Sequence, residues 1–385
     1  MSASYHSHIF NMTYHDETNS KRTHGLHQFA IATSTSEGEY HPLAPNTEMF
    51  RSLSVAVNLG LEILESQAGR RALAELGHAF VARQARRSQH HAFAGDLNRM
   101  ENYVDHFLDS VRNQYPLVGV QQENDQVICT TSPGLVSSDL HSFHPENAGI
   151  FTYNIDLVNI MVDAQNVSLR ATKLADKRSS KDRWRNFVFI FACATLHQLA
   201  DLFTAYLSPG RTYPPPLLRD PKRVGGRWLE CRLYGGSLEI YKSHNQSPDD
   251  PGMLCLVDES YNIVRRIDPR AITECLENPQ GYRFPFPSIG EDITIARMRT
   301  LGYQNTASTS SFGVTLPHNA RAMREFVARP ELLRYSLPVE DLRLTPFRAK
   351  KRYPSQTYFA PVHYHETEVW QPPSRTPVDV VMVDA

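Results

Sequence analysis

Residues 187–207, which read FVFIFACATLHQLADLFTAYL, form a long apolar stretch that decides how the chain folds. The stretch is long enough to cross a membrane, but His197, Gln198 and Asp201 lie in its middle, where a charged group is costly in lipid. We therefore interpret it as the buried core helix of a globular protein, predicted over 183–207 and ended by the Pro/Gly-rich segment that follows.

The bulk composition of the 385-residue chain is that of an ordinary globular protein, with 41% apolar and 21% charged residues. A formal charge of −1 argues against nucleic-acid or anionic-membrane partners that bind by bulk electrostatics. The N-terminus lacks the pattern of a signal peptide, and the five cysteines are scattered without a C-x-x-C pair. We expect a cytoplasmic protein with reduced thiols that binds neither nucleic acid nor membrane.

The chain divides into three segments by composition. Residues 1–45 are polar and rich in His, Ser and Thr without periodicity, which predicts a disordered N-terminal segment. Residues 46–285 contain the periodic apolar runs and form the predicted core domain. Residues 286–385 are Pro-rich and predict an extension that packs on the core, with one helix near 318–328.

The predicted fold class is α+β, dominated by helices, with a small β-sheet or hairpin. Charged residues over 171–185 predict a solvated loop before the core helix. Further helices are expected over 47–66, with Asn46 as N-cap, and over 68–87, 96–115, 226–234 and 268–276. Strands are expected over 117–120 and 126–131, at the start of 150–162, and in a hairpin of 237–243 and 253–258 with 261–267.

Two sequence elements carry the candidate site. LHQLAD (196–201) lies within the core helix, and GGRWLECRLYGG (225–236) follows after a loop that contains three prolines in a row. Together these residues resemble a group of fungal proteins related to the zincin metallopeptidases, whose apolar helix carries H-E-L-x-H before a Pro-containing loop and a W/L-E…LFGG element. The resemblance covers residues 150–241, under a third of the chain, and implies a zincin-like core.

In the intact motif, two histidines one turn apart bind zinc, the Glu beside the first is the general base, and a later carboxylate is the third ligand. This chain keeps the first histidine as His197, but Gln198 replaces the Glu and Asp201 replaces the second histidine. Glu230 is the Glu of the W/L-E element, and Val224 stands where another Glu is expected. Because Gln198 cannot take up a proton, the resemblance implies no standard protease activity.

Three interpretations of the remaining residues stay open. His197, Asp201 and Glu230 could bind a divalent metal (Zn, Fe or Mn), which would leave a residual metal-dependent hydrolase. Without metal or other cofactor, His197 and Asp201 could form a catalytic acid/base pair acting on a small-molecule substrate. That enzyme would be a cyclase, isomerase or other tailoring enzyme of fungal secondary metabolism. Alternatively, the protein is a non-catalytic binding or scaffold pseudoenzyme whose polar groups are satisfied.

Solvent access separates these interpretations. An enzyme requires His197 and Asp201 to face an open, mostly apolar pocket, whereas a scaffold is expected to seal both under packed side chains. Two further groups of residues are site candidates. His363 and His365 with Glu366 have the spacing of a strand metal site within a Pro-rich tail, and the polar loop 141–146 could line a pocket.

Overall fold

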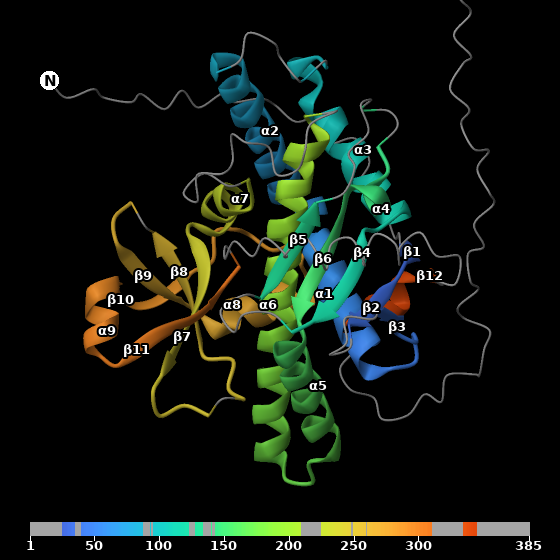
Figure 1. Ribbon diagram of the computed structural model, residues 1–385. Helices are drawn as coiled ribbons and strands as arrows, with labels where there is room; N and C mark the ends of the chain where they lie inside the picture. Colours follow the sequence, from blue (N-terminus) through green and yellow to red (C-terminus); the bar gives the residue numbers. More distant parts are fainter. Residues whose placement is uncertain are drawn as a thin grey trace, which may run out of the picture.

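The computed structural model describes residues 25–34, 40–87, 93, 95–122, 128–133, 140, 143–208, 225–247, 249–258, 260–309 and 334–344. Within these ranges the protein combines long helices with several small sheets, a helix-dominated α+β fold (Figure 1). The sheet content exceeds the single small sheet or hairpin expected from the sequence, since two five-stranded sheets and one two-stranded sheet are present.

The long helix α6 (Leu174–Tyr206) lies between the two larger sheets, and all its residues from Phe187 onward are buried. It packs against α1 (Glu48–Glu65), where Gly60 allows a close approach: a Cβ there would lie 2.7 Å from the Ala192 carbonyl oxygen. By length and composition α6 is the one helix in the described ranges that could cross a membrane, yet 94% of its most apolar window is buried inside the protein. Such burial is typical of the core helix of a soluble protein.

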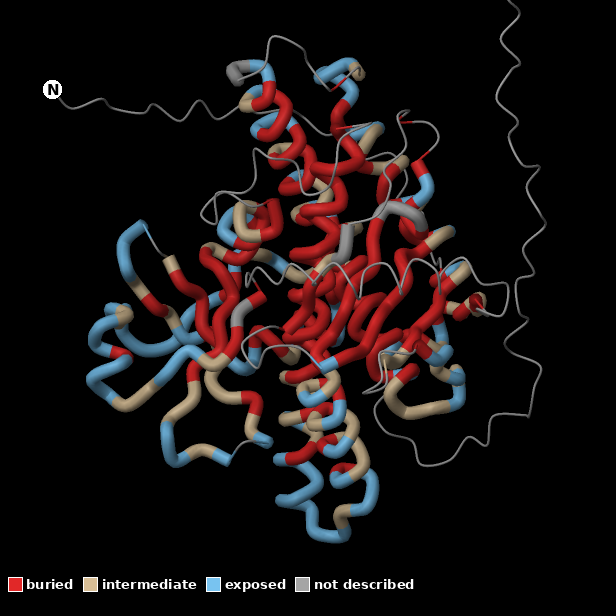
Figure 2. Tube along the Cα trace, in the orientation of Figure 1, coloured by how far each residue is buried: buried red, intermediate tan, exposed pale blue. Residues whose placement is uncertain are grey.

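The N-terminal turns of α6 correct one prediction. Residues 171–185 were expected to form a solvated loop, but α6 begins at Leu174 and pairs with α5 (Ile155–Arg170). Lys, Arg and Ala favour helix, and the buried Ser180 and Trp184 lie one turn apart on the face that packs. Figure 2 shows that the tip of this α5–α6 hairpin is exposed while the middle of α6 is buried.

The first sheet lies on one side of α6 and has the order β3-β2-β4-β6-β5. Strands β2, β4 and β6 are parallel, and the two edge strands β3 and β5 are antiparallel to their neighbours. The predicted strands at 117–120 and 126–131 are present, but each pairs with β6 and not with the other. The five strands are β2 (Ile31–Ser34), β3 (Tyr40–Pro42), β4 (Leu117–Gln121), β5 (Cys129–Pro133) and β6 (Gly149–Asn154).

The second sheet lies on the other side of α6 and is antiparallel throughout, in the order β10-β9-β8-β7-β11. Its strands are β7 (Ser237–Ser243), β8 (Met253–Asp258), β9 (Ile263–Ile267), β10 (Ser288–Thr294) and β11 (Tyr303–Ser308). The predicted hairpin of β7, β8 and β9 is found. Strands β10 and β11 come from the segment assigned to the C-terminal extension, so the boundary drawn at residue 285 cuts through this sheet.

The remaining helices surround these layers. Helix α7 (Gly225–Tyr234) leads directly into β7, and α8 (Pro269–Glu277) packs on α6. The others are α2 (Gln67–Arg87), α3 (Met100–Asn113), α4 (Pro145–Ala148) and α9 (Ile295–Thr300), with short 3-10 turns at Leu97–Arg99 and Val339–Leu342. The helices predicted over 47–66, 68–87, 96–115, 226–234 and 268–276 match α1, α2, α3, α7 and α8 within a few residues.

A two-stranded sheet joins β1 (Leu26–Phe29) to β12 (Tyr335–Leu337), with Leu26 opposite Leu337. The prediction of disorder over residues 1–45 is therefore wrong for residues 26–34 and 40–42, which carry three strands. These strands are stabilised by partners far away in the sequence, which local composition does not reveal. Residues 1–24, the predicted helix near 318–328 and residues 345–385 lie outside the described residues.

Candidate functional site

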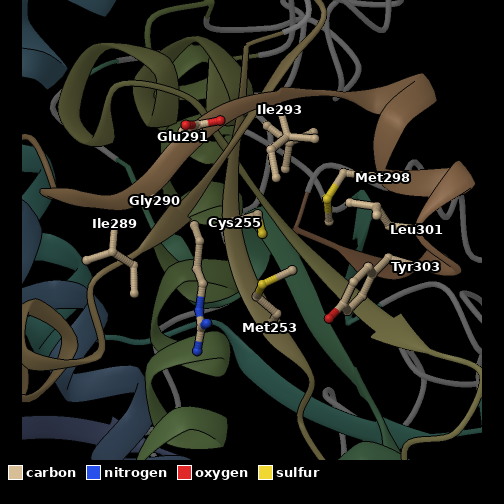
Figure 3. A pocket seen from close by; sticks show the side chains of 11 residues that line it. Met253, Cys255, Ile289, Gly290, Glu291, Ile293, Met298, Leu301 and Tyr303 are labelled. Atoms are coloured by element: carbon tan, nitrogen blue, oxygen red, sulfur yellow. The ribbon is translucent and has the colours of Figure 1, made fainter.

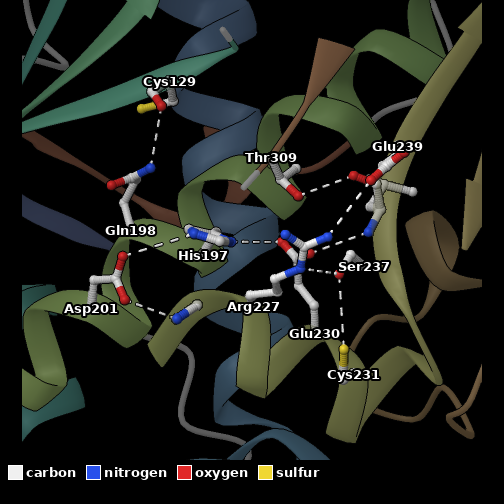
Figure 4. A network of polar contacts seen from close by, with 12 residues as sticks. Cys129, His197, Gln198, Asp201, Arg227, Glu230, Cys231, Ser237, Glu239 and Thr309 are labelled. Atoms are coloured by element: carbon white, nitrogen blue, oxygen red, sulfur yellow. Dashed lines mark hydrogen bonds and ion pairs between the residues drawn. The ribbon is translucent and has the colours of Figure 1, made fainter. Parts of the chain in front are cut away.

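The site residues singled out from the sequence form a buried cluster between α6 and α7, which we refer to as the polar centre (His197, Gln198, Asp201 and Glu230; Figure 4). Glu230 Oε1 lies 2.9 Å from His197 Nδ1, and Asp201 Oδ2 lies 3.8 Å from His197 Nε2. The first contact is a hydrogen bond, whereas the second is long enough to be only electrostatic. The two carboxylates thus flank opposite edges of one imidazole ring.

The N-terminus of α7 covers this ring. The backbone N–H of Gly226 donates to Asp201 Oδ1 at 2.8 Å, as first-turn amides of helices do with carboxylates. A Cβ on Gly226 would lie 2.3 Å from His197 Cδ2, so only glycine allows the backbone to approach the imidazole this closely. From the sequence, Gly226 is predicted only as the start of a helix, and the Gly225-Gly226 pair is the signal for a close backbone contact.

Glu230 connects the histidine to the second sheet. Its side chain is 0% exposed, and its second oxygen, Oε2, accepts a hydrogen bond from the backbone N–H of Leu238 in β7 at 3.2 Å. Both carboxylate oxygens therefore have partners, one in α6 and one in β7. A buried carboxylate needs such partners, because desolvation without compensation is costly.

Gln198 connects the same turn of α6 to the first sheet. Its Nε2 donates to the Cys129 carbonyl oxygen at 3.2 Å, and its Oε1 accepts from the Thr131 hydroxyl, both on β5. The amide uses its donor and its acceptor at once, which an ionised glutamate cannot do. Gln198 thus ties α6 to the edge strand β5.

A second set of polar contacts continues from α7 across the second sheet (Figure 4). Arg227 Nε donates to Ser237 Oγ at 2.9 Å, and Arg227 Nη2 lies 3.7 Å from Glu239 Oε1. Glu239 Oε2 in turn accepts from Asn305 Nδ2 at 2.7 Å and from Tyr241 Oη at 3.1 Å. Polar contacts therefore extend from β5, through α6 and α7, to β7 and β11.

The electrostatics of the polar centre favour a bound proton near neutral pH. Burial raises the pKa of Asp201 to about 6, against the opposing effects of the His197 charge and the backbone N–H groups of Gly226 and Gly225. Burial alone would lower the pKa of His197, but the charge and hydrogen bond of Glu230 and the charge of Asp201 outweigh it, so this pKa is raised.

The geometry does not fit the proposed three-ligand metal site. That site requires Glu230 to reach the helix face that carries His197 and Asp201, yet Glu230 binds Nδ1 while Asp201 faces Nε2 on the opposite edge. Among the described residues, no group of three His, Cys, Asp or Glu side chains converges as metal ligands do. Glu230 instead holds Nδ1 of the ring and orients it, as a carboxylate does with a histidine that binds metal through its other nitrogen.

The other site candidates lie apart from the polar centre or outside the described residues. In the loop 141–146, His144 is exposed, and its Nδ1 lies 3.3 Å from Gln114 Oε1 and 3.5 Å from Glu146 Oε1. It makes no contact with His197 in the described structure. His141, Val224 and the tail residues His363–Glu366 lie outside the described ranges.

Comparison with known proteins adds no relative. No protein-family model matches this chain, and no curated protein or solved structure matches it significantly. Function is therefore inferred from the geometry of the polar centre itself.

Proposed function

We propose that this protein is a non-catalytic binding or scaffold protein, derived from a zincin-like metallopeptidase, whose former active-site residues now join its layers. One observation carries the proposal: the His197 ring is held at one edge by Glu230, faces Asp201 at the other, and is covered by Gly226. His197 and Asp201 still share one face of α6, one turn apart, which is where the two ligands of the intact motif would lie.

Burial supports a structural role for the polar centre. His197 is 3% exposed, Asp201 8% and Glu230 0%. A general acid or base must come within hydrogen-bond distance of its substrate, directly or through one water. In the described structure the contacts of these three side chains are instead with one another and with the backbone of α7 and β7, which is how buried polar groups stabilise a fold.

A second candidate function is a metal-free acid/base enzyme, such as a cyclase, isomerase or other tailoring enzyme of fungal secondary metabolism. It is favoured by the pKa of Asp201, raised to about 6, since groups that titrate near neutral pH are typical of acid/base catalysis. This function requires α7 to move away from His197, which breaks the hydrogen bond between Gly226 and Asp201.

Chemical accessibility of His197 separates the two functions. Native protein is treated with diethyl pyrocarbonate, which acylates accessible imidazoles, and modification is mapped by mass spectrometry. The exposed His27 and His144 serve as internal references. We expect both references to react quickly, whereas His197 reacts only after unfolding in urea. Reaction of native His197 at the rate of His144 would overturn the sealed site and favour the enzyme.

Elemental analysis tests the remaining, metal-dependent interpretation. The purified full-length protein is expected to contain no stoichiometric zinc, iron or manganese, because only two of the three predicted ligands face a common point. Stoichiometric metal that disappears in His197→Ala and persists in His144→Ala would contradict the proposal and restore a residual hydrolase.

A further inference from the structure

A cavity of about 320 Å³ lies on the outer face of the second sheet (Figure 3). Side chains alternate along β8, so that Leu254 and Leu256 join the main core while Met253 and Cys255 face the opposite side. Among the described residues, the cavity on this face is lined by β8, β9, the edge strand β10, the helix α9 and the start of β11. Its apolar lining includes Met253, Cys255, Val264, Ile293, Met298 and Tyr303.

An irregularity in the edge strand β10 opens this cavity. β10 pairs with β9 at Ile289 and again at Ile293. The register shifts between these two positions, so residues 290–292 form a bulge in β10. Gly290 has φ 82°, and a Cβ there would meet nothing within 4 Å. Asp292 forms an ion pair with Arg265 at 3.3 Å, which anchors this bulge. Bulges at sheet edges commonly re-aim side chains beside binding sites.

The cavity contains one cationic side chain. Arg266 of β9 lies opposite Cys255 on one neighbouring strand and opposite Ile289 on the other. In the described part of the chain, no salt bridge within 4.0 Å involves Arg266. The charge of Arg266 acts on Cys255 in the cavity lining. Burial raises the pKa of the Cys255 thiol to about 12, and the Arg266 charge works against this rise. A guanidinium beside apolar walls matches an amphipathic anion.

We propose that this cavity binds a small apolar monocarboxylic acid, with its carboxylate on Arg266 and its hydrocarbon part between β8 and α9. The guanidinium offers two parallel N–H donors to a carboxylate, and the flexible side chains of Met253 and Met298 adapt to an apolar chain. Glu291 lies at the cavity on the bulge and disfavours a second negative charge on the ligand. The volume is at the lower end for small-molecule sites.

This inference goes beyond the proposed function and is independent of it. The cavity shares no lining residue with the polar centre, so failure to bind an acid would leave the sealed His197 unaffected, and reaction of His197 with pyrocarbonate would leave the cavity unaffected.

Calorimetric titration of the full-length protein with decanoate and with decanol tests the role of Arg266. We expect decanoate to bind more tightly than decanol, and Arg266→Met to weaken decanoate about tenfold or more while leaving decanol unchanged. Arg270→Met, an exposed arginine on α8 outside the cavity lining, is the matched control and should bind decanoate like the wild type. Equal losses in both variants would show non-specific charge attraction and overturn the proposal.

A second variant locates the bound acid without relying on Arg266. Ile289 lies at the cavity and is 37% exposed, so Ile289→Trp places a fluorophore there with little effect on folding. Decanoate should shift the emission of this variant beyond any change in the wild type, which has three tryptophans, and Arg266→Met in the same background should need about tenfold more decanoate or more for the same shift. Two results would overturn the proposal. One is a dissociation constant of the wild type for decanoate weaker than about 1 mM, and the other is an unchanged tryptophan emission.

Discussion

The polar centre and the outer cavity of the second sheet differ in a way that bears on function. At the polar centre, chemically versatile side chains are sealed by α7 and hydrogen-bonded to the backbone. At the cavity, a space of about 320 Å³ is lined mainly by apolar side chains, with one arginine and one glutamate. Residues suited to catalysis thus lie buried, whereas the cavity lies where the residues suit binding. The comparison favours a binding protein over an enzyme.

Removing the buried carboxylate of the polar centre should give the largest effect. Glu230→Ala leaves His197 Nδ1 and the Leu238 N–H without their partner, and breaking a buried charged pair in this way costs about 3–5 kcal/mol of unfolding free energy. Urea unfolding measures it. The matched control is Glu277→Ala, since Glu277 forms an exposed ion pair with Arg185 and should cost below about 1 kcal/mol. Similar losses in the two variants would contradict a structural role for Glu230.

The pH dependence of stability should reveal Asp201. The pKa of Asp201 is about 6 in the folded protein and 3.8 ordinarily, so ionisation favours the unfolded state. The stability of the wild type is therefore unaffected by Asp201 below about pH 4 and falls as the pH rises from there through about 6. Asp201→Asn has no such titration. Relative to the wild type, this variant should therefore gain up to about 3 kcal/mol between about pH 4 and about pH 7 in urea unfolding. Parallel pH profiles of the two proteins would show that Asp201 is not buried beside His197.

Closure of α7 over the histidine can be tested by adding one methyl group. Gly226→Ala places a Cβ 2.3 Å from the His197 ring, and such overpacking should cost about 2–3 kcal/mol. Gly225→Ala is the matched neighbour, because its closest contact is 3.0 Å, and it should cost less. Thermal unfolding compares the two. Equal stability would indicate that the helix start is free to move from the ring, as an accessible site requires.

A glutamate at position 198, as in the motif that the sequence resembles, should destabilise the protein without creating activity. In Gln198→Glu a carboxylate faces the Cys129 carbonyl oxygen and cannot donate to it, which should cost about 1–2 kcal/mol. Gln165→Glu is the control, since Gln165 only accepts a hydrogen bond, from Ser52, in the described contacts, and a carboxylate can do the same. Peptidase activity in the first variant, measured on a casein substrate, would show that the site is open.

A substitution at the cavity should change the free energy of unfolding least. Ile289→Ala truncates a side chain that is 37% exposed, so its effect on unfolding should be within about 0.5 kcal/mol, as for most surface positions. A loss as large as that of Gly226→Ala would mean that β10 is part of the main core, and that the cavity is a packing defect instead of a ligand site.

The elements that the sequence predicts correctly are those whose physical signal is local. The helical spacing of apolar residues predicts α1, α2 and the buried part of α6, because a periodic face packs in almost any fold. The i, i+4 spacing also places His197 and Asp201 on one face, and their proximity is found. The charged start of α6 is not predicted, because its residues show no obvious apolar face although they favour helix.

The parts that escaped prediction depend on contacts between remote segments. The spacing of His197 and Glu230 does not tell which ring nitrogen the carboxylate reaches, and that choice separates a metal ligand from an orienting group. The contact of Gly226 with the ring depends on how α7 docks. Likewise, β10 and β11 belong to the second sheet only through pairing with β9 and β7.

The pairing of β1 with β12 imposes an order in time on the folding of this chain. The hydrogen bond between His27 and Ser336 spans 309 positions, so β1 has no partner strand until nearly the whole described chain has been synthesised. At ribosomal rates of about 5–20 residues per second, that interval is roughly 15–60 s. Phe29 packs on Phe50 and Tyr115, which are synthesised early, but Leu26 lacks its partner Leu337 throughout this interval and stays available to chaperones or to neighbouring chains. Translation speed and chaperone supply should therefore affect the yield of this protein more than its final stability suggests.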